Sequence, residues 1–322
     1  MKAKFIALAA LVLGMVSCQQ DFDGAAQVGG EVDFQLAVAA PELAGTRADG
    51  DSQNGHNSAF GAIDYLTDWS DVDLRYTLEV YDVKDNVVTN LTPVKDRMEK
   101  IVEEYTPVTF DLRLVPGREY RFVVFADFVK ADGTAFHVFD KTLQDITLAN
   151  DAINEELTDA YFDYEDITVS NSAAQDMTLT RPFGKVRVVA TDLAELNLNV
   201  DPTAVTVTYE SEIPTAFNAV TGKVSTKVKK LSFSYDYAAI SKTDLSAHYY
   251  TEGYDSEEYK NADERHTHMT LFTDYILAEE EMTPLQFTMT VYDKNGDKEE
   301  NIIKTTEFNT DIPVQRNHLT TI

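Results

Sequence analysis

Residues 177–191 read MTLTRPFGKVRVVAT, and this stretch decides how the chain is organised. Its apolar residues are spaced as in two β-strands that are interrupted at Pro182 and Gly184. Proline cannot donate a hydrogen bond to a β-ladder, and glycine often marks a bend in a strand. A strand that bends here can leave one sheet and enter another. We therefore predict a domain boundary near Arg181.

Upstream, residues 31–40 alternate well between larger apolar side chains and other residues. One face of the expected strand carries Val32, Phe34, Leu36 and Val38. This period of two is typical of a half-buried strand. Residues 41–62 follow; they are rich in small and polar residues without an apolar period, which predicts a linker or mobile loop.

Most of the remaining chain also reads as strands and turns. In the first half, strands are expected at 74–82 and 136–139, and residues 108–114 and 120–129 are expected to form a hairpin around Pro116-Gly117. In the second half, strands are expected at 204–209, 229–235, 268–277, 285–292 and 301–308, with a hairpin turn at Asn295-Gly296.

Two segments break this pattern, and one pair of segments repeats. The apolar spacing of 92–104 suggests a short helix, and the acidic stretch 150–166 suggests a loop with one helical turn. Residues 78–82 (LEVYD) and 289–293 (MTVYD) each lead into a turn, as two related β-sandwiches in tandem would. The predicted fold is all-β, with sandwiches at 31–181 and 182–322 and a few short helices.

The N-terminus predicts export. Lys2 and Lys4 precede an apolar run, Phe5–Val16, that is too short to span a bilayer and fits a secretory signal peptide. The run ends at Cys18 in a pattern that resembles a lipobox, so we expect a signal peptide at 1–17 and a lipidated linker at 18–30. The acidic residues after Cys18 resemble a surface-export signal. The other reading of Cys18, a buried free cysteine, stays open.

Composition excludes one class of function. The chain has 55 acidic and 27 basic residues, a formal net charge of −28. Such a chain repels phosphate backbones, so nucleic-acid binding is excluded. Cys18 is the one cysteine, so the core must hold without an internal disulfide.

The sequence shows no catalytic motif: no G-x-S-x-G, no P-loop and no G-x-G-x-x-G. His266 and His268 lack the companion ligands of a metal site, and a hairpin explains 293–300 better than a calcium loop does. We expect no catalytic residue, no metal and no cofactor. Carboxylate pairs for glycoside hydrolysis, and Tyr249, Tyr250 and Tyr254 for sugar stacking, stay open as alternatives.

Several segments together resemble the fimbrillins, or type V pilins, and the related fimbrillin-like surface lipoproteins. They are the lipobox cysteine, residues 46–48 (TRA), residues 179–186 (LTRPFGKV) and residues 312–319 (IPVQRNHL). The resemblance implies two transthyretin-like, Greek-key β-sandwiches and export as a lipoprotein. It also implies that a trypsin-like protease cuts between Arg47 and Ala48, that the first strand leaves, and that a partner subunit's strand takes its place.

Physical chemistry makes this mechanism reasonable for the chain. Burial of Val32, Phe34, Leu36 and Val38 is worth roughly 1.5–3 kcal/mol each, so their removal leaves an apolar slot between unpaired strand edges. Proteases cut most readily in exposed linkers, where Arg47 is expected, although Arg47 also reads simply as an exposed basic residue. The sequence given stops at Ile322, where polymerising members carry a donor segment. Either the sequence is truncated there or the protein lacks its own donor, and the second alternative favours an anchor or accessory role.

The leading hypothesis is a fimbrial subunit or anchor, lipid-anchored in the outer membrane, surface-exposed or part of a fimbrium, with other fimbrial subunits as its partners. The alternative is a monomeric surface lipoprotein that binds glycans or a host. A secreted hydrolase is the third possibility.

Overall fold

The computed structural model describes residues 30–40, 72–103, 105–139, 141–170, 174–190, 202–237, 269–293 and 299–322. Within them the protein is all-β, which confirms the predicted class. The helices in the described ranges are 3-10 turns of three residues, at Ala149–Asp151, Glu156–Thr158 and Glu299–Asn301. In the same ranges, no helix has the length and apolarity needed to cross a membrane.

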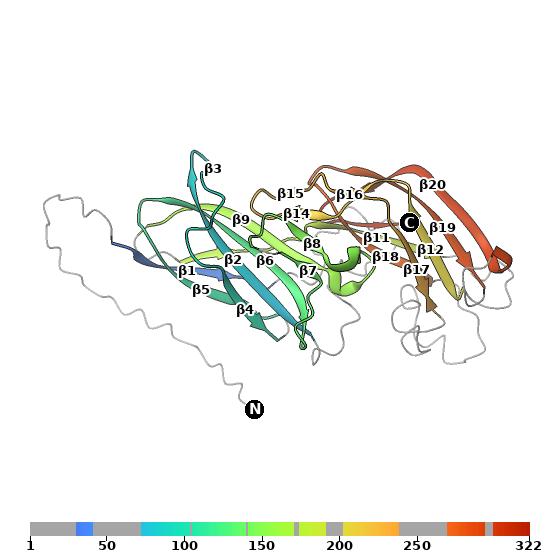
Figure 1. Cartoon of the computed structure of the whole chain (residues 1–322), viewed down its shortest axis with the longest axis horizontal. Helices are drawn as coiled ribbons and strands as arrows, with labels where there is room; N and C mark the ends of the chain where they lie inside the picture. The colour runs from blue at the N-terminus through green and yellow to red at the C-terminus, as the bar shows by residue number, and fades with distance from the viewer. Residues whose placement is uncertain are drawn as a thin grey trace, which may run out of the picture.

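In the first half, two sheets enclose a core (Figure 1). One sheet has the order β10 (Ala174–Met177), β1 (Val32–Val38), β5 (Val108–Leu114). The other has the order β3 (Val87–Val88), β2 (Val72–Lys84), β6 (Glu119–Lys130), β9 (Ala160–Thr168), and β4 (Met98–Val102) also pairs with β2.

The second half contains a three-stranded and a four-stranded sheet. One sheet has the order β18 (Met269–Leu277), β11 (Phe183–Ala190), β21 (Leu319–Thr321). The other has the order β17 (Ser232–Asp236), β12 (Ala204–Tyr209), β19 (Thr283–Tyr292), β20 (Ile302–Val314). A small ladder joins β13 (Ile213–Pro214) to β16 (Val228–Lys229).

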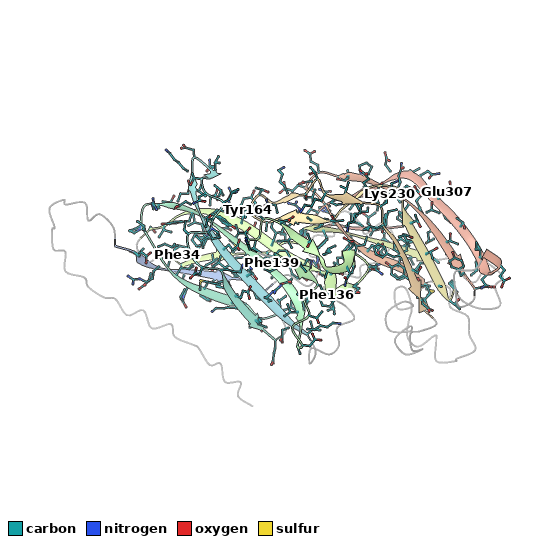
Figure 2. The ribbon with its side chains drawn as sticks, viewed as in Figure 1. Phe34, Phe136, Phe139, Tyr164, Lys230 and Glu307 are labelled. Atoms are coloured by element: carbon teal, nitrogen blue, oxygen red, sulfur yellow. The ribbon has the colours of Figure 1, made fainter. Side chains whose placement is uncertain are left out.

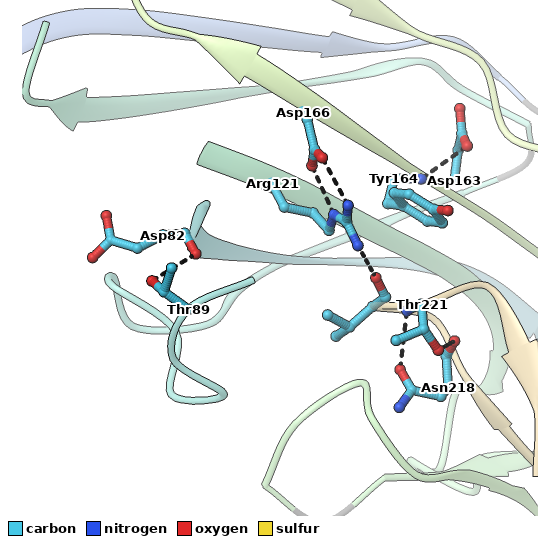
Figure 3. Close-up of polar contacts among 9 residues, drawn as sticks. Asp82, Thr89, Arg121, Asp163, Tyr164, Asp166, Asn218 and Thr221 are labelled. Atoms are coloured by element: carbon cyan, nitrogen blue, oxygen red, sulfur yellow. Dashed lines mark hydrogen bonds and ion pairs between the residues drawn. The ribbon is translucent and has the colours of Figure 1, made fainter. Parts of the chain in front are cut away.

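A shared sheet and an arginine join the halves. In this sheet, β15 (Lys223–Val224), β14 (Ala216–Asn218), β8 (Ile146–Leu148) and β7 (His137–Val138) lie in order, so β14 of the second half pairs with β8 of the first. Arg121 on β6 forms a bidentate ion pair with Asp166 at 2.7 Å and donates to the carbonyl of Val220 at 2.9 Å (Figure 3). This contact between the two halves, the joint, therefore combines backbone pairing of β8 with β14 and the charge-assisted hydrogen bonds of Arg121.

The central strand β6 is buried on both faces. Phe122 and Val124 lie in the first core, while Val123 and Phe125 lie in the cluster that also holds the second-half core. Strands covered on both faces read as continuous apolar runs rather than alternating ones. The division at Arg181 and the tandem transthyretin-like topology both stay predictions, because the packing is continuous across the boundary.

Three local predictions were wrong. Residues 98–102 form strand β4 instead of a helix, because they pair with β2 along its edge. The strands at 108–114 and 119–130 form no hairpin, because β5 pairs with β1 whereas β6 pairs with β2 and β9. The end of the acidic stretch 150–166 forms strand β9 instead of a loop, because Ala160, Tyr161 and Phe162 are buried against β6.

The chain does pass from a first-half sheet to a second-half sheet across Pro182, since β10 lies in one and β11 in the other. The predicted strand just before Pro182 is wrong, because β10 ends at Met177 and Thr180 forms only a single bridge with Phe162. Gly184 lies within β11 and does not break it. The antiparallel pairing of β19 with β20 confirms the second-half hairpin, although its turn at Asn295-Gly296 lies outside the described residues.

The two most distinctive sequence segments, 179–186 and 312–319, lie against each other. The amide of Asn317 donates to the carbonyl of Phe183 at 2.7 Å, and the amide of Lys185 donates to the carbonyl of His318 at 2.9 Å. A Cβ atom on Gly184 would lie 2.6 Å from Cγ1 of Val314 and 2.8 Å from the carbonyl oxygen of Gln315. Glycine is therefore required at this close approach of two backbones.

We predict that Gly184→Ala lowers the free energy of unfolding by about 1–3 kcal/mol, because the added methyl group overpacks a contact that includes backbone. Urea denaturation measures this change. Gly30→Ala is the matched control, since a Cβ atom there meets nothing within 4 Å. Equal stability of the two variants would contradict the close approach.

A histidine is buried between the two halves. His137 is 3% exposed, its ring lies 5.3 Å from that of Phe125 and 6.0 Å from that of Phe183, and neither ring nitrogen has a hydrogen-bond partner among the described residues. Burial, and secondarily the charge of Arg75, lower the pKa of His137 to about 3. The neighbouring carboxylate of Asp127 already accepts two hydrogen bonds from Arg75.

We predict that His137 makes the fold sensitive to acid. Because its pKa is lower in the folded state, the unfolded chain binds the extra proton, so stability falls as pH drops from about 6.5 toward 3. Far below pH 6.5 the loss approaches about 1.4 kcal/mol per pH unit. His137→Leu should flatten this slope in denaturation measured from pH 7 to 4. Burial raises the pKa of the neighbouring Asp127 to about 6, so Asp127 opposes the slope over the same range. Identical slopes in the two proteins would contradict a lowered pKa of His137 in the folded state.

Candidate functional site

The candidate site is strand β1 and the slot that it fills. β1 pairs antiparallel with β5 along its whole length and parallel with β10 over Gln35–Val38. In the described part of the chain, β5 and β10 do not pair with each other, so β1 alone joins them into a sheet. Removal of β1 would leave two unpaired edges with a gap of one strand between them.

The inner face of β1 is apolar, as the alternation predicts. Phe34, Leu36 and Val38 are 2%, 0% and 1% exposed, and Val32 is partly buried. The ring of Phe34 stacks on that of Phe122 with centroids 4.9 Å apart, and Leu36 lies opposite Phe110. Figure 2 shows Phe34 at the end of the molecule opposite to Glu307 of β20. At about 1.5–3 kcal/mol each, these side chains hold the strand mainly by burial.

The outer face of β1 is polar and paired with charges. Lys95 lies 2.6 Å from the carboxylate of Glu31, and Arg113 lies 3.7 Å from that of Asp33. The hydrogen bond from Lys95 lowers the pKa of Glu31 below its usual value. The side-chain amide of Gln35 donates to Asp111 at 2.9 Å. These partners could not be found from the sequence, because only the register of β1 on β5 brings them together.

Beside the start of β1 the slot is open. The pairing with β10 begins at Gln35, and in the described residues Val32–Phe34 have β5 as their one strand partner. A depression of about 510 Å³ opens there, lined by Asp33, Phe34, Gln35, Asp111, Leu112, Arg113 and Ala174. Its lining is mixed polar and apolar, without a cluster of catalytic side chains.

The other predicted site residues lie outside the described residues. These are Cys18, Arg47, Ala48, His266, His268 and the three tyrosines at 249, 250 and 254. Lipidation and processing therefore stay predictions. Within the described ranges, no group of three or more His, Cys, Asp or Glu side chains is arranged to hold a metal ion.

We predict that Phe34→Ala lowers the free energy of unfolding by about 3–5 kcal/mol, because it removes a buried ring and leaves a cavity against Phe122. Gln35→Ala, the adjacent outward-facing control, should cost about 1 kcal/mol or less. Urea denaturation of the full chain measures both values. Equal, small losses would show that β1 contributes little to the core.

Comparison with known proteins places the chain among distant relatives. No curated protein matches it. It is similar to a fimbrial assembly protein of Parabacteroides distasonis, at 10% identity over 91% of this chain and 90% of that one, with a TM-score of 0.45. It is also similar to the fimbrial anchor protein Mfa2 of Porphyromonas gingivalis, at 12% identity over 85% and 82% of the two chains, with a TM-score of 0.39.

A further similarity is to a protein of Bacteroides ovatus provisionally described as a cell adhesion protein, at 10% identity over 91% of both chains, with a TM-score of 0.45. These likenesses are distant. The match to a family model is more extensive, since the model covers residues 25–322. The chain therefore belongs to DUF6562, a family of unknown function.

Proposed function

We propose that the protein is a cell-surface lipoprotein that acts as a fimbrial subunit, or as an anchor or accessory component of a fimbrium, and assembles by β-strand addition. Its partners are other fimbrial subunits, each of which supplies an extended strand. The role is structural and not enzymatic. The observation that supports this proposal is the position of β1, which is the one strand among the described residues that bridges β5 and β10.

A bridging strand can be replaced without rebuilding the fold. The backbone donors and acceptors of β5 that β1 now satisfies are equally available to any extended chain. Added strands gain affinity from main-chain hydrogen bonds and specificity from pockets for alternate side chains. The pockets here are those of Phe34, Leu36 and Val38, which are buried in the first core.

β1 must be released before another strand can replace it, and the sequence contains a candidate cleavage site for this release. Arg47-Ala48 lies between β1 and β2 in the chain, so a cut there would leave β1 held by non-covalent contacts alone. The lipid-bearing Cys18 lies on the same side of the cut as β1. A cut protein would therefore lose its covalent link to the membrane and suit a shaft, while an uncut one would stay anchored.

Limited proteolysis of the lipidated precursor with a trypsin-like protease tests this function. We expect one early cut that creates a new N-terminus at Ala48, followed by release of the segment that contains β1 and by the appearance of oligomers. Mass spectrometry identifies the cut, and size-exclusion chromatography detects the oligomers.

Arg47→Gln is the control: it should block the early cut and keep the protein monomeric and membrane-bound. If the cut protein retains β1 and never binds another strand, assembly by strand exchange is wrong. A protein that stays monomeric under all these conditions and binds glycans would instead support the monomeric binding role.

A further inference from the structure

The outer face of the β1 slot carries an ordered charge pattern. At the beginning of β1, two cations contact its acidic residues: Lys95 with Glu31 at 2.6 Å, and Arg113 with Asp33 at 3.7 Å. Arg113 also donates to the backbone carbonyl of Glu31 at 3.4 Å. Lys95 lies before β4 and Arg113 on β5, so two separate segments place positive charge at this end.

The middle and far end of the slot carry acidic side chains, in contrast to the cations at its beginning. Asp111 on β5 accepts the side-chain amide of Gln35, and Asp176 on β10 lies in register with Ala37. The outward positions 33, 35 and 37 of β1 therefore meet a cation, an anion and an anion in turn. A third cation, Lys100, lies near the far end, but its ammonium donates to the backbone carbonyl of Thr109.

We propose that Lys95, Arg113, Asp111 and Asp176 select the strand that occupies this slot. The preferred occupant is an extended segment with acidic residues at its first two outward positions, a hydrogen-bond donor at the third and a residue other than an acid at the last. Its inward positions are apolar, with an aromatic ring to stack on Phe122. This selection rests on the proposed function, because it requires that a partner's strand enter the slot.

The same pattern fixes the direction of the occupant. A strand with its acidic residues at the start places them beside Lys95 and Arg113 only when it runs antiparallel to β5, as β1 does. Acidic residues moved to the other end would lie near Asp176 and leave both cations unpaired. Opposite charges on facing strands are favourable and like charges are unfavourable by similar amounts. Apolar burial therefore provides affinity, and the outer charges provide direction and register.

Peptide uptake by the full chain, cut after Arg47, tests this selection. The reference probe is a fluorescent peptide of residues 31–40, EVDFQLAVAA. The matched probe combines Glu31→Ala, Asp33→Ala, Ala37→Asp and Ala39→Glu, which keeps the composition and the apolar face but moves both acids to the other end. At low ionic strength we expect the matched probe to bind about three- to ten-fold more weakly.

Charge reversal of the slot provides the second measurement. On Arg113→Glu protein, a peptide with Asp33→Lys should bind more tightly than the reference peptide, which reverses the preference of the unmodified protein. Arg118→Glu is the control, because Arg118 pairs with Asp82 and not with β1. All these preferences should shrink at about 0.5 M salt, since exposed charges are screened.

The outcomes separate the two proposals. If no peptide enters the slot, strand exchange itself is wrong. If the reference peptide enters but the moved-acid probe binds equally well, and Arg113→Glu leaves the preference unchanged, strand exchange stands and the charge selection is overturned.

Discussion

Burial of the sheet β2-β6-β9 on both faces is the constraint on which the rest of the structure depends. One face of β6 closes the first core against β1 and β5, and the other face lies in the cluster that contains the second half. A sheet with two apolar faces is stable only when another layer packs against each face. The inner sheet of the first half is held by Arg121, by the β8–β14 pairing and by the second-half core, and β1 takes part in none of these contacts.

Strand β1 takes no part in the joint formed by Arg121 and the β8–β14 pairing. The pairing partners of β1, β5 and β10, both belong to the first half, and its inward side chains lie in the first core. The joint holds buried and charge-assisted contacts, whereas the ion pairs of β1 are exposed. Exposed pairs contribute little to stability but are well suited to set direction and register. Firm support on one side and a strand held mainly by burial on the other are what the proposed assembly by strand addition would require.

Sequence periodicity was informative where one face of a strand is buried. The alternation in β1, and the apolar runs of β2, β6, β12 and β19, all correspond to strands. It was misleading for 98–102, where an edge strand has little apolar burial and its spacing resembled a helix. The prediction of a hairpin at 108–129 failed for a different reason. A tight turn at 115–118 shows that two strands follow each other in the chain, but not that they pair in one sheet.

The sequence by itself determined the all-β class, the inward face of β1 and the bend at Pro182, because each follows from local side-chain chemistry or backbone geometry. Only the tertiary structure decided that β1 bridges β5 and β10, that Gly184 contacts Val314 and Gln315, and that Lys95 and Arg113 meet the acids of β1. Those contacts join residues far apart in the chain, and they depend on strand register. A shift of one residue would turn every side chain of β1 to the opposite face.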